Sequence, residues 1–499
     1  LSRGLSYKDA EFMLDVAPLT TAQRTEFDAA ALFWSQRLLP ELESAIERSG
    51  HQAGLISRQY WSAHQRFFKQ LCVCAKVPAL IQRVKKALRE GYAPIIGLQS
   101  TGEAALDRAV AADSDLREPI SLCQAQLLGF IENNFPTSLA PDQKIAKDVT
   151  KAERMVEMTL EACAAARAAF LQNSSLPIFR EALQKAETDH AMATMQLTQL
   201  RRQAEVNAAN AGIEIPELVQ RKAMLMHEAQ SLTLPPAALD MIIDECGGPS
   251  NVAEMTGRKA RMVRTPDGKR FMLAARAKPE SNEMDNLNVT ERNAFMDGKK
   301  LIAIISDAAS TGISLQADLR VKNQRRRCHI TLELAWSADK AVQQLGRSHR
   351  ANQKSAPLYI LLTTDVGGEA RFASAVARRL QALGALTKGD RRAEIGSLDS
   401  FNFDTVFGKR ALRHVLNGLC EGSSSIPCVA AALKSSDYLD YMQGIDNIGA
   451  GNASERDKLE VKRFLNRLLG LTLKEQSLLF DLFAATLTSV IEAARRDGK

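Results

Sequence analysis

The chain has 499 residues, of which 45% are hydrophobic and 25% charged, a balance typical of a globular rather than a disordered protein. The formal net charge of +7 fits an acidic partner, but it also fits lysines that only face solvent. The eight cysteines include no Cys-x-x-Cys pair of zinc spacing, and no apolar run approaches the ~20 residues of a membrane-spanning helix. We therefore expect a soluble intracellular protein with reduced thiols, room for about three domains, and no membrane partner.

Residues 1–45 are predicted to form a helical lead-in. The apolar positions of residues 21–39 repeat at helical spacing, and Pro40 is expected to end that helix.

The next stretch, residues 46–134, changes character. Residues 61–71 and 78–88 look helical, and the apolar run 92–98 after them is closed by the polar residues 99–101. A helix, a buried strand and a polar loop in this order are typical of a parallel α/β sheet.

Residues 135–285 break this pattern and predict a mostly helical insertion. The stretch 144–212 is rich in Ala, Glu, Arg, Gln and Met, and its turn-like residues 173–175 indicate two long helices folded into a hairpin. Residues 240–245 predict a short helix. Residues 259–276, divided by a Pro-Asp-Gly turn, predict a β-hairpin.

The α/β pattern resumes in residues 286–410. Residues 301–305, 329–334 and 358–362 are short apolar runs, as expected for strands that are covered on both faces. The sheet is therefore predicted to be one domain interrupted by the insertion. Residues 411–499 are predicted to form a helical C-terminal region.

Polar segments follow three of the predicted strands, and ligands of open α/β sheets meet the loops at the carboxyl ends of strands. The first segment is residues 99–101. The second is residues 306–312, whose hydroxyl and backbone N–H groups could hold a phosphate or ribose. The third is residues 343–353, Gln-Gln-Leu-Gly-Arg-Ser-His-Arg-Ala-Asn-Gln. Each segment taken alone also fits a simple turn or helix cap.

Two arginines of the third segment, Arg347 and Arg350, would lie on one face if the segment is helical. A guanidinium is always charged, and its fork of donors matches phosphate oxygens. Such arginines serve NTP-driven enzymes as arginine fingers, which need a phosphate cradle to act on. The sequence contains no G-x-x-x-x-G-K-[ST] motif and no acidic box of the D-E-x-H type.

A basic run, residues 320–327, precedes the third predicted strand. Its cations could simply face solvent, but we favour contacts with a phosphate backbone, which give affinity without reading sequence. No aromatic residues interleave the run, so base stacking is not indicated. The predicted phosphate contacts are Lys322, Arg325, Arg326 and Arg327.

The order of these segments resembles motifs IV, V and VI of the second RecA-like lobe of superfamily 2 helicases, and neighbouring words resemble the strawberry notch family. The words are Trp61-Ser-Ala-His-Gln-Arg-Phe-Phe-Lys, Gly247-Gly-Pro-Ser-Asn-Val-Ala-Glu-Met-Thr-Gly-Arg, Val321-Lys-Asn-Gln-Arg-Arg-Arg, Trp336-Ser-Ala-Asp-Lys and Leu386-Thr-Lys-Gly-Asp-Arg-Arg. The resemblance implies a RecA-like α/β fold, with a parallel sheet and helices on both faces. Residues 46–134 and 286–410 would be two parts of that lobe.

The resemblance also implies roles for single residues. Arg347 and Arg350 would reach the γ-phosphate of ATP. For His349, a hydrogen bond that supports its neighbours and a catalytic role both stay open. Further nucleotide-site residues would be Gln343, Gly346, Asp307, Ser310, Thr311 and Gly312, and motif IV would face nucleic acid with Gln99, Ser100 and Thr101.

The implied function is that of a nuclear, ATP-dependent regulator of transcription on chromatin, with DNA favoured as the nucleic acid. The groups that hold Mg²⁺ and the β- and γ-phosphates would belong to a first lobe absent from this chain. ATP and Mg²⁺ are therefore expected only with that lobe, and the chain is not expected to hydrolyse ATP alone. Its start without Met agrees with an N-terminally incomplete protein. The alternatives are a non-catalytic helicase-fold scaffold for transcription or chromatin proteins and a standalone DNA-binding fragment.

Overall fold

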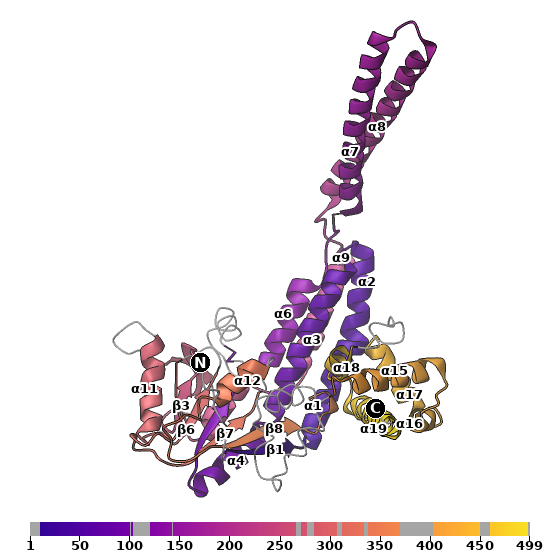
Figure 1. Ribbon diagram of the computed structural model, residues 1–499. Coiled ribbons are helices and arrows are strands. Elements are labelled where there is room, and N and C mark those ends of the chain that lie inside the picture. Colours follow the sequence, from indigo (N-terminus) through magenta and orange to yellow (C-terminus); the bar gives the residue numbers. More distant parts are fainter. Residues whose placement is uncertain are drawn as a thin grey trace. The chain divides into compact units, whose positions relative to one another are not determined.

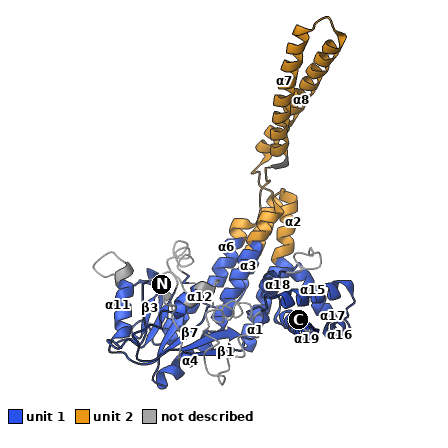
Figure 2. Ribbon diagram, in the orientation of Figure 1, with its two compact units in different colours: residues 1–37, 60–130, 228–499 blue, residues 38–59, 131–227 orange. Residues whose placement is uncertain are grey.

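The structure is a computed structural model, and it describes residues 10–99, 101–102, 120–141, 143–265, 271–276, 284–306, 312–333, 338–369, 403–449 and 460–497. The chain divides into two compact units, coloured separately in Figure 2. Unit 1 comprises Leu1–Arg37, Tyr60–Phe130 and Glu228–Lys499, and unit 2 comprises Leu38–Gln59 and Ile131–His227.

The described part of unit 1 holds a six-stranded parallel sheet in the order β1-β8-β7-β2-β6-β3 (Figure 1). The strands are β1 Glu11–Ala17, β2 Ala93–Gly97, β3 Val252–Met255, β6 Ile302–Ile305, β7 Arg327–Thr331 and β8 Leu358–Thr364. The predicted α/β fold with a parallel sheet is confirmed, and β2, β6, β7 and β8 fall within two residues of the predicted apolar runs at their starts and ends, apart from the end of β7.

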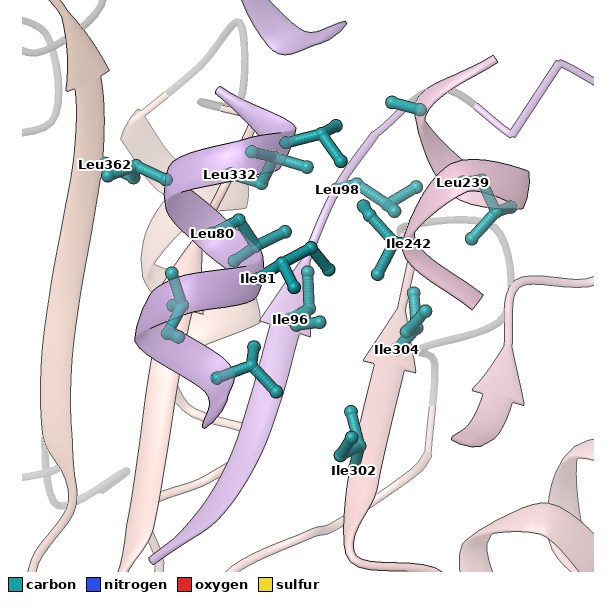
Figure 3. Close-up of a cluster of buried hydrophobic side chains, with 14 of the residues drawn as sticks. Leu80, Ile81, Ile96, Leu98, Leu239, Ile242, Ile302, Ile304, Leu332 and Leu362 are labelled. Carbon is teal, nitrogen blue, oxygen red and sulfur yellow. The ribbon is translucent and has the colours of Figure 1, made fainter. Parts of the chain in front are cut away.

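Helices cover both faces of this sheet, which explains why the inner strands β2 and β6 are apolar throughout. On one face, α4 (Val77–Arg89) and α10 (Ala238–Glu245) pack onto the strands, and Figure 3 shows Leu80 and Ile242 lying against Ile96. On the other face, α11 (Met284–Met296) supplies Phe295 to a second buried cluster with alternate strand residues. Because successive side chains of a strand point to opposite faces, alternate residues of the same strands contribute to the two cores.

Two strands were missed by the sequence analysis. β1 lies in the predicted helical lead-in, and among the described residues it pairs only with β8. Its apolar residues are interrupted by Asp15, and most of its side chains are exposed or half-buried, as at the edge of a sheet. β3 lies in the predicted insertion and contains Glu254, whose buried carboxylate pairs with Arg258 Nε at 2.6 Å. A charged residue inside a four-residue strand hides the strand pattern.

The helices before the sheet also differ from the prediction. α1 (Thr21–Leu32) leads through a π-helical turn (Phe33–Leu38) into α2 (Leu39–Ser49), so Pro40 does not end a helix. Proline is tolerated there because the first turn of a helix has N–H groups without helical partners anyway.

The predicted helical hairpin is confirmed in unit 2, where it consists of α7 (Gln143–Gln172) and α8 (Pro177–Asn210) (Figure 1). Thr159 Oγ1 lies 3.2 Å from His190 Nδ1 across the two helices. Within the described residues, the remaining helices before the C-terminal region are α3 Ala53–Ala75, α6 Leu122–Asn134, α9 Pro216–Ser231 and α12 Ala338–Leu345. The predicted β-hairpin is also confirmed, with β4 (Ala260–Arg264) antiparallel to β5 (Phe271–Ala275).

The predicted helical C-terminal region is confirmed by a separate buried core. Its helices are α15 Val406–Glu421, α16 Pro427–Ala432, α17 Tyr438–Asn447, α18 Val461–Leu468 and α19 Leu473–Arg496. Among the described residues, α19 is the one helix long and apolar enough to cross a membrane by length and composition. Its Leu479 and Phe483 are buried in this core, as in a core helix. The 3₁₀ turn Gly367–Glu369 links the region to β8, since the Gly368 N–H donates to Gln476 Oε1 at 3.2 Å.

Candidate functional site

The carboxyl ends of β2 and β7 are joined by hydrogen bonds. The N–H of Leu332 donates to the Gly97 carbonyl at 3.0 Å, and the N–H of Gln99 donates to the Glu333 carboxylate at 2.8 Å. Gln99 and Thr101 are half-buried, whereas Ser100 lies outside the described residues. The predicted motif IV segment is therefore at the sheet edge expected for it.

Glu333 is paired with Lys69 of α3, with 3.0 Å between Oε1 and Nζ. The two side chains are only 5% and 7% exposed. Burial lowers the pKa of Lys69, and the charge of Glu333 opposes this by favouring the ammonium form. A buried ion pair thus lies directly beneath the loop after β2.

Gln344, near the end of α12, connects the motif IV and motif VI segments. Its amide Nε2 donates to the Leu98 carbonyl at 3.2 Å. A Cβ atom on Gly97 would lie 2.9 Å from Gln344 Cδ, so the buried glutamine can pack here only because position 97 has no side chain. The neighbouring Gln343 is exposed.

Residues 346–350, here called the arginine segment, are not helical. Arg347 and Arg350 therefore do not share the face of a helix, contrary to the prediction from sequence. α12 ends at Leu345, and residues 346–350 form a turn and an irregular segment. Ser348 Oγ donates to the Leu345 carbonyl at 3.1 Å, which satisfies a helix-end acceptor. Gly346, the first residue after α12, is half-buried.

The two arginines have different environments. Arg347 is half-buried, and its Nη1 donates to the Ile313 carbonyl at 3.5 Å, while its own carbonyl accepts from the Leu315 N–H at 2.7 Å. Arg350 is exposed, and its N–H donates to Gln353 Oε1 at 3.1 Å. The chain after β6 therefore touches the arginine segment, as the order of motifs V and VI predicts.

The motif V segment is described only in part. Gly312 is exposed and has a φ of +82°, a left-handed conformation that suits glycine. The other three predicted residues, Asp307, Ser310 and Thr311, lie outside the described residues, so their predicted roles stay predictions.

Buried histidines support the arginine segment from below. His329 of β7 lies with its Nδ1 2.8 Å from Ser348 Oγ, and burial lowers the pKa of His329 to about 3. His349 is also buried, and burial lowers its pKa. Burial thus disfavours the charged form of both imidazoles; since a neutral imidazole can still accept a proton, both roles predicted for His349 stay predictions.

Arg327, one of the predicted phosphate contacts, is fully buried, and that prediction is wrong. Its guanidinium lies 4.9 Å from the Phe295 ring centroid. Its donors reach backbone carbonyls of the preceding loops: Leu315 at 2.7 Å, Arg325 at 2.8 Å, Asn323 at 2.9 Å and Gln316 at 3.2 Å. A run of arginines in a sequence predicts side chains that face solvent. Arg327, however, is the first residue of β7, and its side chain is buried in the core.

The rest of the basic run lies at the amino end of β7. Gln99 and Glu333 lie beyond the carboxyl ends of the strands, at the opposite end of the sheet. Lys322 and Arg325 are exposed. Arg326 is half-buried and already has partners within the chain. Its Nη2 pairs with Glu11 at 2.9 Å, and its Nε donates to the Ala356 carbonyl at 2.7 Å. The structure therefore does not bring the basic run to the arginine segment, and only Lys322 and Arg325 keep the exposure that the predicted phosphate contacts need.

Three supporting residues were missed: Lys69, Glu333 and Gln344. Glu333 was counted inside the predicted strand 329–334, whereas β7 ends at Thr331. A carboxylate directly after an apolar strand was the available signal. Among the residues that the structure describes, no group of three His, Cys, Asp or Glu side chains could hold a metal ion.

These features define a class of protein. A parallel sheet with helices on both faces, whose loops after β2 and β6 meet a glycine–arginine segment after β7, is a RecA-like lobe with helicase motif order. A sequence model of a helicase C-terminal family, described as the C-terminal domain on Strawberry notch homologue, matches residues 237–499, more than half of the chain. The chain belongs to the strawberry notch family.

Its relatives agree over the whole length of the chain. Strawberry notch homolog 1 of Rattus norvegicus is 36% identical over 100% of the chain, and homolog 2 of Homo sapiens is 37% identical over 100%. Protein FORGETTER 1 of Arabidopsis thaliana is 34% identical over 99%. These matches cover 41%, 39% and 45% of the three relatives, so the chain spans less than half of their length. No solved structure matches the chain.

Proposed function

We propose that this chain is the second lobe of a two-lobed, ATP-dependent protein that acts on nucleic acid, with DNA favoured, in the regulation of transcription on chromatin in the nucleus. Family membership supports the helicase class. The finer role is our proposal, because the chain spans less than half of its relatives' length.

The observation that carries this proposal is the exposed Arg350 beside an anchored Arg347. Arg347 is held against the Ile313 carbonyl, which leaves Arg350 to face outward from the same short segment. When a first lobe closes on this surface, the Arg350 guanidinium can stabilise negative charge on a phosphoryl group that is being transferred.

The cationic donors of this segment fit a nucleotide phosphate, but they are only one side of such a site. ATP would supply the phosphoryl group, and Mg²⁺ would be bound with it. The sequence contains no P-loop lysine with a following hydroxyl, so those groups would come from the first lobe. In this proposal the chain orients the transferred phosphoryl group and neutralises its negative charge, but it does not by itself hold the β-phosphate.

The test is the steady-state ATPase of a longer protein that includes the first lobe, with and without DNA. We expect Arg350→Ala to lower the DNA-stimulated rate by about 10³-fold, the lower range for an arginine finger. Arg180→Ala is the matched control, since it removes an exposed arginine of α8 that has no predicted part in the site, and it should leave both the stimulated and the unstimulated rate unchanged. Wild-type turnover in Arg350→Ala would refute the assignment.

The scaffold alternative has one observation in its favour. The α7/α8 hairpin exposes large apolar side chains, with Leu171 75%, Met195 77% and Met158 64% exposed, as a surface for protein partners would. In that case the wild-type longer protein would show no ATPase stimulation by any nucleic acid, while binding of transcription or chromatin proteins would depend on these residues.

A further inference from the structure

A three-residue segment, residues 97–99, is held from one side by the chain that follows β7. The N–H groups of Leu332 and Glu333 both donate to the Gly97 carbonyl, at 3.0 and 3.3 Å. In return, the Glu333 carboxylate accepts the Gln99 N–H at 2.8 Å. Gln99 is the residue at which the sheet edge becomes the motif IV loop, so its direction depends on this last bond.

The position of the Glu333 acceptor is set in turn by Lys69, whose Nζ lies 3.0 Å from the other carboxylate oxygen. Both side chains are almost fully buried. A buried ion pair of this kind adds little net stability, because the desolvation of two charges offsets most of their attraction. What the pair does provide is an acceptor with one fixed place and a full negative charge, and charge-assisted hydrogen bonds are stronger than neutral ones.

The same segment also touches the end of α12. The Leu98 carbonyl accepts from Gln344 Nε2 at 3.2 Å, and Gly97 leaves room for that side chain. A displacement of residues 97–99 would therefore displace Gln344, which lies three residues before Arg347. The loop after β2 and the arginine segment share one support.

We propose that Glu333 and Lys69 are positioning residues that hold the loop after β2 in the orientation with which it contacts nucleic acid. This inference rests on the proposed function in naming nucleic acid as the ligand of the loop. Neither residue touches the ligand. They act through the Gln99 backbone and, through Leu98 and Gln344, on the arginine segment.

The chain contains a matched comparison. Lys76 pairs with Glu369 at 2.6 Å, with side chains 1% and 6% exposed, and Glu369 accepts the Thr364 N–H at 2.6 Å. This pair has the same chemistry and a similar burial, but it secures the end of β8 and the turn that contacts the C-terminal helices.

The variants separate the acceptor from the charge. Lys69→Met with Glu333→Gln removes both charges but keeps an acceptor oxygen, whereas Lys69→Met with Glu333→Leu removes the acceptor as well. Glu333→Asp keeps a carboxylate for the ion pair with Lys69, but its shorter side chain no longer reaches the Gln99 N–H. This variant replaces the leucine variant in the test if the leucine variant does not fold. Lys76→Met with Glu369→Leu is the control for the loss of an equally buried pair.

The first measurement is amide hydrogen exchange of Gln99 in this chain. We expect exchange to be at least about tenfold faster in Lys69→Met/Glu333→Leu and in Glu333→Asp, the loss that corresponds to one hydrogen bond. Lys69→Met/Glu333→Gln should be intermediate, about threefold faster than wild type, because it keeps an acceptor oxygen but loses the charge and the lysine that fixes its place. Lys76→Met/Glu369→Leu should leave Gln99 unchanged. Equal exchange at Gln99 in wild type and Lys69→Met/Glu333→Leu would overturn the inference.

The second measurement is the DNA concentration for half-maximal ATPase in the longer protein. It should rise about tenfold in Lys69→Met/Glu333→Leu, and it should not rise in the Lys76→Met/Glu369→Leu control. An equal rise of this DNA concentration in the control would mean that Glu333 acts only on stability, as any buried pair does, and would overturn the inference. If wild type shows no stimulation at all, the proposed function fails, and Gln99 exchange still decides whether Glu333 and Lys69 position the loop.

Discussion

Replacement of Arg327 by leucine tests the buried role that separates this residue from the rest of the basic run. In wild type its guanidinium satisfies the carbonyls of Leu315, Gln316, Asn323 and Arg325 and lies over the ring of Phe295. Leucine fills part of the same space but donates no hydrogen bond. Arg327→Leu therefore leaves these carbonyls without the donor that holds the loop before β7 onto the sheet.

The magnitude follows from two opposing terms. Loss of the donor to each of the four carbonyls costs about 1.5 kcal/mol. Against this, burial lowers the pKa of Arg327 to about 10 from an ordinary 12.5. That shift means that the buried charge costs about 3 kcal/mol, which the leucine recovers. The net expectation is that Arg327→Leu lowers the free energy of unfolding by about 3 kcal/mol.

The assay is urea unfolding followed by circular dichroism, with Arg325→Ala as the control. Arg325 is exposed on the same loop, so its removal should change the free energy of unfolding by less than about 0.5 kcal/mol. If Arg327→Leu were as stable as wild type, or if Arg325→Ala were equally destabilising, the burial of Arg327 would be refuted.

Two further predictions concern buried groups elsewhere in unit 1. Burial, and secondarily the charge of Arg467, lowers the pKa of His64 to about 3. Below about pH 6.5 the unfolded chain binds a proton at this histidine and the folded chain does not, so stability falls as the pH drops from about 6.5 toward 3. We expect the free energy of unfolding to drop by about 2 kcal/mol more between pH 7 and pH 5 in wild type than in His64→Phe; an identical pH dependence in urea titrations would contradict this. Gly368→Ala would place a Cβ 2.7 Å from Leu469 Cα, and backbone there cannot yield cheaply. It should destabilise the protein by about 2–3 kcal/mol, and an unchanged thermal midpoint would show that the C-terminal helices adapt.

Much of the fold could be predicted from the sequence because its signals are local. Some strands covered on both faces are apolar throughout, as in Ile302–Ile305, and the long helices of unit 2 repeat at helical spacing without interior glycine. β1 was missed because Asp15 divides its apolar residues into two short runs and no polar loop or helix pattern before it marks a strand.

The site could be predicted only in outline. Gln99 follows a strand-to-loop boundary, and Arg350 lies in a polar segment with the letters of a helicase motif, and both are signals that sequence reasoning finds. The partnership of Lys69 with Glu333 joins residues far apart in the chain, and no local pattern indicates it. Arg325 and Arg327 are alike in sequence, but Arg325 lies exposed in the loop before β7, whereas Arg327 begins the strand and is buried. Burial, a property of the folded chain, decides between a structural arginine and an exposed one.

The most direct test of the proposed function is the ATPase rate of the longer protein with its first lobe, measured with and without DNA for wild type and for Arg350→Ala. The account predicts that DNA stimulates the wild-type rate and that Arg350→Ala lowers the stimulated rate by about 10³-fold while DNA binding persists. No stimulation of the wild type by any nucleic acid, or full stimulated turnover in Arg350→Ala, would contradict it.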